Sequence, residues 1–290
     1  MNAKLIKELR DISGAGMMDC KKALEENDND IKKATEWLRE KGIAKAAKKA
    51  GRIAAEGLST IVTNGNKAVV LEINCETDFV AKNEKFEKFV NDVANTILNS
   101  DAKTNEEALA LPCEDGTLND YVTNMTATIG EKISFRRFAN VTKEDDENFG
   151  AYIHMGGKIS VLTILKGASE AVAKDVSMHA AAMRPEFVKK DDVPADRLEN
   201  EKKILTEEVI REGKPANIAE KIVMGKLNKF YKEVCLEEQE FVKDNSVTVS
   251  KYISNNGGSL VDVIRFEVGE GLEKRQENFA EEVAAQMKGE

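Results

Sequence analysis

The sequence has few of the side chains from which metal sites and nucleophilic active sites are built. It contains two histidines and four separate cysteines, Cys20, Cys75, Cys113 and Cys235, with no C-x-x-C pair. This excludes the usual zinc modules and a disulfide framework, and we expect each cysteine to be a small buried hydrophobe in a reducing compartment. The common phosphate-loop, zinc-protease and serine-hydrolase motifs are missing too. We therefore expect no metal site and no cofactor, and no motif argues for an enzyme.

Long apolar runs are also missing. No run approaches the ~18 residues that a membrane span needs, and runs such as 159–165 have the length of a strand. The N-terminus enters an amphipathic pattern that contains Glu8 and Asp11, whereas a signal peptide has an apolar centre and a transit peptide is poor in acids. We expect a cytoplasmic protein that does not contact membranes, and the lack of a transit peptide favours a bacterial source.

The charge is unevenly distributed. The 290 residues carry a net charge of −9, yet residues 1–52 hold 13 Lys and Arg against 9 Asp and Glu. The rest of the chain is therefore strongly acidic, which argues against direct binding of nucleic acid because phosphate neutralisation needs a basic surface. The length suggests about two domains of about 150 residues.

The first 53 residues have a helical pattern. Apolar residues recur every three or four positions in segments 5–9, 17–24 and 31–38, which predicts three short helices. Gly42 fits the position just after the third helix, and an alanine-rich linker helix is expected over 43–57.

The pattern then changes to the period of two that is typical of strands. Segments 58–63 and 67–74 flank Asn64-Gly65, which predicts a hairpin, and a helix over 86–97 and a strand over 133–141 follow. A second hairpin is expected over 149–165, followed by a helix over 172–183. Residues 70–73 match 161–164, 91 residues later, and 80–82 match 172–174, 92 residues later, which indicates a duplication with one inserted turn residue.

Two helical stretches, 196–212 and 217–229, interrupt the second repeat. A Gly-Lys-Pro turn joins them, so they predict a helical hairpin that projects as an arm. The chain returns to the sheet with a strand over 260–268 and ends in a helix.

We therefore predict an α+β fold with a duplicated core of antiparallel sheets and helices. The expected parts are an N-terminal three-helix domain with its linker helix (1–53), a first core subdomain (54–141), a second core subdomain (142–185 and 230–268), a coiled-coil arm (186–229) and a C-terminal helical module (269–290).

The most informative segment for function is 74–83, which joins a buried strand to a helix. Thr77 or Asp78 suits the helix N-cap, and either Val80 or Phe79 would fasten the turn to the sheet. The second repeat has no aromatic residue at its corresponding junction, 167–170. Phe79, a bulky ring next to an acid, is therefore also a candidate wedge for a partner protein.

Three motifs resemble elongation factor Ts, the nucleotide-exchange factor of elongation factor Tu. They are residues 77–83 (TDFVAKN), 14–24 (GAGMMDCKKAL) and 265–274 (RFEVGEGLEK). The predicted parts also follow one another in the order of that family, so the resemblance covers nearly the whole chain.

The resemblance implies how the parts would act. The N-terminal bundle would be a ubiquitin-associated-like domain that docks on the partner's GTPase domain. The turn would disturb the partner's magnesium site and phosphate-binding loop, and the second repeat and the C-terminal helix would add contacts. The residues implied are Met17 and Met18 in the bundle, Thr77, Asp78, Phe79 and Val80 in the turn, His154 in the second repeat, and Phe279 and Val283 in the last helix. A dimer or a 2:2 assembly with the partner stays open.

Two other hypotheses come from different classes. An adaptor would use the N-terminal bundle for ubiquitin-like or nascent-chain partners, which leaves the core unexplained. An enzyme would pair His154 with a cysteine, although no local signature supports it. An ordinary turn position for His154 and a packed site for His179 are the simpler interpretations of the two histidines.

Overall fold

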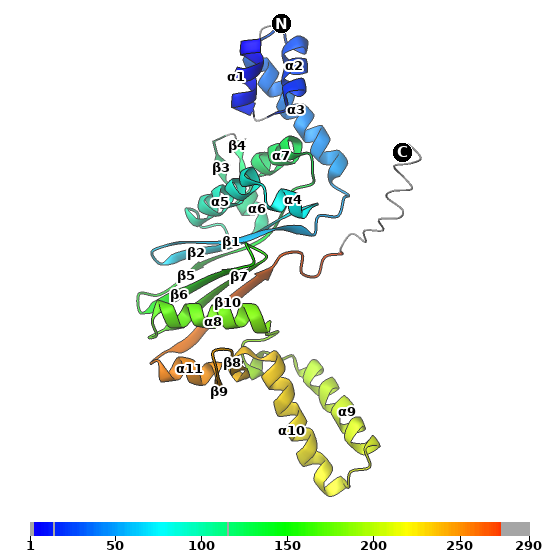
Figure 1. The fold of residues 1–290 in the computed structure, drawn as a ribbon, viewed down its shortest axis with the longest axis vertical. Coiled ribbons are helices and arrows are strands. Elements are labelled where there is room, and N and C mark those ends of the chain that lie inside the picture. Colours follow the sequence, from blue (N-terminus) through cyan, green and yellow to red (C-terminus); the bar gives the residue numbers. More distant parts are fainter. Residues whose placement is uncertain (1–2, 14, 115, 274–290) are drawn as a thin grey trace.

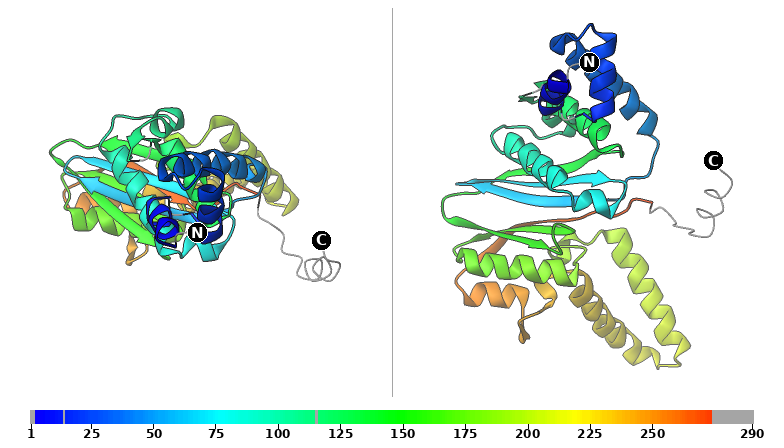
Figure 2. Two further views of the ribbon diagram at one scale, coloured as in Figure 1. Left: turned by 90° about the horizontal axis from the view of Figure 1, so that it is seen from above. Right: turned by 45° about the horizontal axis from the view of Figure 1, so that its top comes forward.

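The molecule is elongated, with helices at its N-terminal end, two stacked sheets in the middle and a helical hairpin at the other end (Figures 1 and 2). The computed structural model describes residues 3–13, 15–114 and 116–273. Both sheets are antiparallel and helices cover their outer faces. The predicted α+β class is confirmed.

The N-terminal helices are α1 (Ala3–Ser13), α2 (Met17–Glu26) and α3 (Ile31–Lys49), which pack around a small core of Leu9, Cys20 and Leu24. Helix α3 runs through Gly42, so the prediction that Gly42 follows the helix end was wrong. The linker helix expected over 43–57 is only the last part of α3, which ends at Lys49, and residues 56 and 57 already belong to β1. The reason is tertiary packing. A Cβ at Gly42 would lie 3.3 Å from the Cβ of Ala127, so the glycine lets α3 approach α7 (Leu118–Ile129) closely.

The first sheet has the order β1-β2-β5, formed by β1 (Glu56–Asn64), β2 (Lys67–Cys75) and β5 (Ser134–Thr142). Its outer face is covered mainly by α5 (Glu84–Leu98), whose apolar stripe begins at Phe86 and Phe89. The short α4 (Asp78–Ala81) lies between β2 and α5, and α6 (Asn105–Leu109), β3 (Pro112–Cys113) and β4 (Gly116–Thr117) precede α7.

The second sheet has the order β10-β7-β6, formed by β6 (Glu147–His154), β7 (Ile159–Lys166) and β10 (Ser259–Glu267). Helix α8 (Glu170–Met183) covers its outer face, and α11 (Val249–Asn255) packs in the same core. Two short strands, β8 (Glu240–Phe241) and β9 (Asp244–Thr248), pair beside it.

The two sheets pack face to face through a separate apolar cluster that includes Val70, Leu162 and Ile164. The central strands β2 and β7 are therefore buried on both faces. This explains why both read as nearly continuous apolar runs in the sequence.

The structure corrects the spacing of the repeat. Val70 faces the other sheet, whereas Val161, its predicted counterpart, faces α8. A one-residue slip turns every strand side chain to the opposite face, so the matching pair is Val70 and Leu162, 92 residues apart. No inserted residue is needed between strand and helix. The length difference lies in the hairpin loops, which have two residues in the first repeat and four in the second.

The arm consists of α9 (Ala195–Arg211) and α10 (Ala216–Val234), which lie side by side and project from the second sheet (Figure 1). Its seam is narrow, with Val209, Val223 and Leu227 buried and the Lys226–Glu208 ion pair at 2.8 Å beside it. Two short 3₁₀ turns, Lys190–Asp192 and Leu236–Glu238, lie at its base. Within the described residues, none of the helices has the length and apolar character that crossing a membrane requires.

Candidate functional site

The turn after β2 is organised by Thr77. Its side chain is the N-cap of α4 and accepts a hydrogen bond from the backbone N–H of Val80 at 3.4 Å. Thr77 has an extended backbone with φ −127°, which is the usual geometry of an N-cap, so the chain enters the helix at Asp78. Of the two N-cap candidates, Thr77 holds the position.

The sequence leaves open whether Val80 or Phe79 fastens the turn to the sheet. Val80 is partly buried and packs against the core of the first sheet, whereas Phe79 is 82% exposed. The second repeat makes the same turn 92 residues later, where Ser169 caps α8 by accepting from Val172 N–H, and Ala171 takes the place of Phe79. The turn therefore does not require an aromatic side chain.

Asp78 lies beside Phe79 and adds a carboxylate to the turn. Its carboxylate accepts a hydrogen bond from Lys82 Nζ at 2.7 Å, and this bond lowers the pKa of Asp78 below its usual 3.8. The charges of Lys82 and Lys158 lower that pKa further. Asp78 is therefore ionised at neutral pH.

Glu131 braces the turn from a neighbouring loop, and the sequence analysis missed it. Its carboxylate accepts hydrogen bonds from the backbone N–H groups of Glu76 and Thr77 at 3.1 and 3.0 Å, and from the Thr77 hydroxyl at 2.7 Å. In return, Glu76 accepts from the backbone N–H of Lys132 at 2.6 Å. In the sequence, Glu131 is one of many acidic residues, and no local signal distinguishes it from the others.

The loop between β6 and β7 lies next to this turn. Ser59 of β1 donates through its backbone N–H to the carbonyl of Gly157 at 2.7 Å, and Lys158 forms an ion pair with Glu56 at the start of β1. Glu56 pairs with Cys75 at the end of β2, from which the turn begins. Both repeats therefore contribute to one end of the sheet pair.

His154 is the last residue of β6, and Met155 is the first residue of that loop. His154 is partly buried, and its Nδ1 lies 3.0 Å from the Tyr152 hydroxyl. Met155 is 70% exposed and was not among the predicted contact residues. No sequence motif distinguishes Met155 from the other methionines, so only its exposed position in the loop marks it.

Met17 and Met18 lie at the start of α2, in the N-terminal helices rather than beside the turn (Figure 1). They are 60% and 72% exposed, while the buried residues of α2 are Cys20, Ala23 and Leu24. Two adjacent helical residues cannot both face one core, and here neither does. The remaining predicted contacts, Phe279 and Val283, fall outside the described residues.

The buried cysteines are poorly suited to nucleophilic chemistry. Burial raises the pKa of Cys75 to about 12 and that of Cys235 to about 11, so both thiols stay protonated at neutral pH. His179 is fully buried, where its Nδ1 accepts from Val242 N–H at 3.1 Å and its Nε2 lies 3.0 Å from Gln239 Oε1. Its packed position agrees with the simpler interpretation of this histidine.

Comparison with known families matches the model described as Elongation factor TS to residues 76–270. This range covers 195 of the 290 residues. The chain belongs to the elongation factor TS family. The matched range contains the turn at 77–80, strand β5 of the first sheet, the whole second sheet and the arm. The N-terminal helices, β1 and β2 precede it. Membership of the elongation factor TS family supports a general role in translation, in nucleotide exchange on elongation factor Tu.

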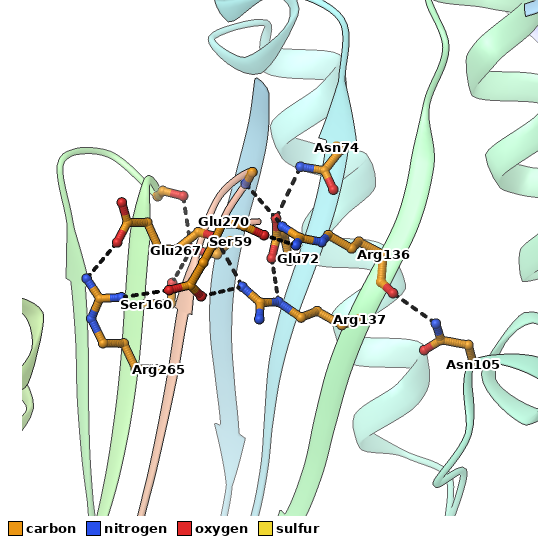
Figure 3. Close-up of polar contacts among 12 residues, drawn as sticks. Ser59, Glu72, Asn74, Asn105, Arg136, Arg137, Ser160, Arg265, Glu267 and Glu270 are labelled. Atoms are coloured by element: carbon orange, nitrogen blue, oxygen red, sulfur yellow. Dashed lines mark hydrogen bonds and ion pairs between the residues drawn. The ribbon is translucent and has the colours of Figure 1, made fainter. Parts of the chain in front are cut away.

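In this member of the elongation factor TS family, residues 267–271 at the end of β10 bind to the first sheet, and we call this segment the clasp. Glu72 of β2 is fully buried, and its carboxylate accepts from Arg136 at 2.7 Å and from Arg137 at 2.6 Å (Figure 3). It also accepts the backbone N–H of Gly269 at 2.9 Å. Gly269 has φ +74°, and a Cβ there would lie 2.2 Å from the carbonyl oxygen of Ala55, so the segment can approach the first sheet this closely only with glycine at this position.

Proposed function

We propose that this chain is a guanine-nucleotide exchange factor that binds elongation factor Tu·GDP and promotes release of GDP and its replacement by GTP. The observation that carries the proposal is the exposure of Phe79. A ring that is 82% exposed, on a capped and braced turn whose counterpart in the second repeat has alanine, serves no packing purpose in this fold. A side chain of that kind fits a pocket on a partner.

Exchange by this route needs no acid, base or nucleophile. Nanomolar nucleotide affinity corresponds to about −12 kcal/mol, so unaided release is slow. A factor that binds the GTPase and weakens its hold on nucleotide is, by linkage, itself bound less tightly in the presence of nucleotide. Removal of the partner's magnesium ion and of its loop amide contacts would weaken the charge-assisted bonds to phosphate.

We assign separate tasks to the candidate residues. Asp78 and Phe79 would press on the partner near its magnesium site, with Thr77 and Val80 holding the turn in place. His154 would add a contact from the second repeat. The N-terminal module 1–53 would dock on the GTPase domain through Met17 and Met18, and Phe279 and Val283 of the C-terminal module would be a further anchor. The core subdomains 54–141 and 142–185 with 230–268 would hold these surfaces together in the bacterial cytoplasm.

The decisive experiment is a release assay. Purified elongation factor Tu is loaded with a fluorescent GDP analogue and chased with excess GTP, and release is followed by stopped flow with and without this protein. We expect catalytic acceleration that rises with the concentration of the factor and saturates. No acceleration with two folded proteins would refute the exchange function and favour an adaptor role for the N-terminal helices.

A magnesium titration tests the mechanism. Because the proposed route loosens the partner's magnesium ion, chelation with EDTA should speed release from elongation factor Tu alone and shrink the advantage that the factor gives. An advantage that stays equally large without magnesium would place the action of the factor elsewhere on the partner.

A further inference from the structure

We propose that Glu131 is a positioning residue for nucleotide exchange, because it fixes the direction in which Phe79 leaves the turn. The inference rests on the exchange function proposed above. Glu131 comes from the loop between α7 and β5, far from the turn in the sequence, and its carboxylate contacts the turn directly. It acts through Phe79 and need not touch the partner.

The contacts form a continuous chain across the base of the wedge. One carboxylate oxygen of Glu131 accepts the N–H groups of Glu76 and Thr77, and the other accepts the Thr77 hydroxyl. The oxygen of that hydroxyl also accepts the N–H of Val80. Glu131 therefore fixes the Thr77 rotamer, and Thr77 in turn fixes the first turn of α4 on both sides of Phe79.

The loop that presents Glu131 is itself held. Gly130 ends α7 in a left-handed conformation with φ +88°, and its carbonyl accepts a hydrogen bond from Lys49. The reciprocal bond from Lys132 N–H to Glu76 closes the bridge between the two loops. Hydrogen bonds to a carboxylate are stronger than neutral ones, so the bridge resists displacement.

The backbone of the turn must be rigid if Phe79 is to press on a partner. A side chain as exposed as Phe79 has few contacts of its own to keep its direction, so the backbone must supply it. If the turn were free to move, part of the binding free energy would be spent on ordering it, and the ring could swing away from the partner. Loss of the brace should therefore reduce the effect of Phe79 without removing the other anchors.

The rival explanation is that Glu131 only stabilises the fold, and Glu107 provides a matched control. At the start of α6, Glu107 accepts the backbone N–H groups of Lys103 and Thr104 at 2.7 and 3.2 Å, and Thr104 caps the helix. Glu107 therefore braces a threonine-capped helix start with one carboxylate, as Glu131 does, but not the turn that bears Phe79.

The test compares Glu131→Ala with Glu107→Ala in the release assay over a range of factor concentrations. For Glu131→Ala we expect about a tenfold lower maximal rate, as charge-assisted bonds are lost, and a half-saturating concentration within about twofold of the wild type. Glu107→Ala should keep both values. Amide hydrogen exchange at residues 76–83 should speed up only in Glu131→Ala, and this readout does not need the partner.

Two further variants separate positioning from other roles. In a Phe79→Ala background, Glu131→Ala should cause little additional loss, because both changes remove the same wedge. Glu131→Gln should retain most of the maximal rate, since its carbonyl can accept both N–H groups and its NH₂ can donate to Thr77. If Glu131→Ala does not fold, Thr77→Val carries the test. It removes both hydrogen bonds of the hydroxyl, to Glu131 and from Val80 N–H, and we expect a loss of at least about threefold.

Three outcomes would overturn the inference. They are a wild-type maximal rate in Glu131→Ala, a full additional loss in the Phe79→Ala background, and a fall in Glu131→Gln as large as in Glu131→Ala, which would assign the effect to charge alone. Failure of the wild-type protein itself to accelerate release would instead overturn the proposed function, and this inference with it.

Discussion

Gly269 and Glu72 lie 197 residues apart in the chain, and the backbone N–H of Gly269 donates a hydrogen bond to Oε1 of Glu72 at 2.9 Å. Glu72 belongs to the first sheet and Gly269 follows the last strand of the second. The contact therefore ties the end of the second repeat to the middle of the first.

The arginines around Glu72 extend this connection. Arg136 donates to the carbonyl of Glu270, and Arg137 donates to the carbonyl of Glu267 at 3.1 Å. The two arginines thus balance the charge of Glu72 inside the protein, and they also hold the segment that follows β10 (Figure 3). A buried ion pair of this kind gives little net stability but is costly to break, so it suits the fixing of one arrangement of the two sheets.

Phe79→Ala should lower the maximal exchange rate by at least about tenfold while changing the affinity for elongation factor Tu much less, because anchoring is spread over several regions. Since the ring is exposed, the free energy of unfolding should change by less than about 0.5 kcal/mol. The measurements are stopped-flow release at saturating factor, a binding titration and thermal unfolding.

Ile210→Ala is the matched control for that variant, since Ile210 is 64% exposed on the arm. It should leave the maximal rate unchanged. An equal loss of rate and affinity in Phe79→Ala would make Phe79 an anchor only, and loss of its fold would return Phe79 to a structural role.

The double variant Met17→Ala/Met18→Ala should have the opposite kinetic signature. Both side chains are exposed, so we expect weaker binding, by about 1–3 kcal/mol if they are interface anchors, and a nearly normal rate at saturation. The half-saturating concentration in the release assay measures this effect. A lowered maximal rate at saturation would contradict a pure docking role.

The local part of this architecture was predictable from the sequence. The strands follow from alternation and apolar runs, the hairpins from Asn64-Gly65 and Met155-Gly156-Gly157, and the N-cap from Thr77. These features depend on residues that are neighbours in the chain. The exposure of at least one of Met17 and Met18 was also predictable, because two adjacent helical residues cannot both face one core.

The long-range part was not predictable. Gly42 looks like a helix end, and only the approach of α7 explains why it lies within a helix. Glu131 and Glu72 look like ordinary acids, because the turn that Glu131 contacts and the arginines that pair with Glu72 lie 54 or more residues away. The register of the repeat differed by one residue because the sequence cannot show which face of a doubly buried strand meets which layer.

His179 should make stability depend on pH. Burial lowers its pKa below the usual 6.5, so near and just below pH 6.5 the unfolded chain binds more protons than the folded one. The contribution of the neutral ring is therefore full above about pH 7.5, begins to decline as the pH falls below 6.5, and is lost as the pH falls through the lower pKa of the folded state. A protonated Nδ1 would also oppose the Val242 N–H that it now accepts.

Denaturant unfolding of the wild type and of His179→Gln between pH 7.5 and 5.5 measures this contribution. The wild type should lose more unfolding free energy over that range than the variant, because other titrating groups are common to both. Equal pH dependence in the two proteins would contradict a buried neutral histidine.

Gly269→Ala and Gly271→Ala separate backbone strain from close approach in the clasp. Both glycines have a left-handed backbone, with φ +74° and φ +72°. A Cβ at Gly271 meets nothing within 4 Å, so Gly271→Ala should be destabilised only by the left-handed conformation, about 1–2 kcal/mol. A Cβ at Gly269 would lie 2.2 Å from the carbonyl oxygen of Ala55, so the backbone must move.

That movement would also break the bond from Gly269 to the buried carboxylate of Glu72. We therefore expect Gly269→Ala to be destabilised by at least about 3 kcal/mol, since displacement of packed backbone adds to the loss of a charge-assisted hydrogen bond. Chemical denaturation of the three proteins under one condition gives the comparison. If the two variants lose equal stability, the strain is common to both glycines and the close approach to Ala55 contributes nothing. A larger loss in Gly269→Ala identifies this glycine as the position at which the C-terminal segment is locked onto the first sheet.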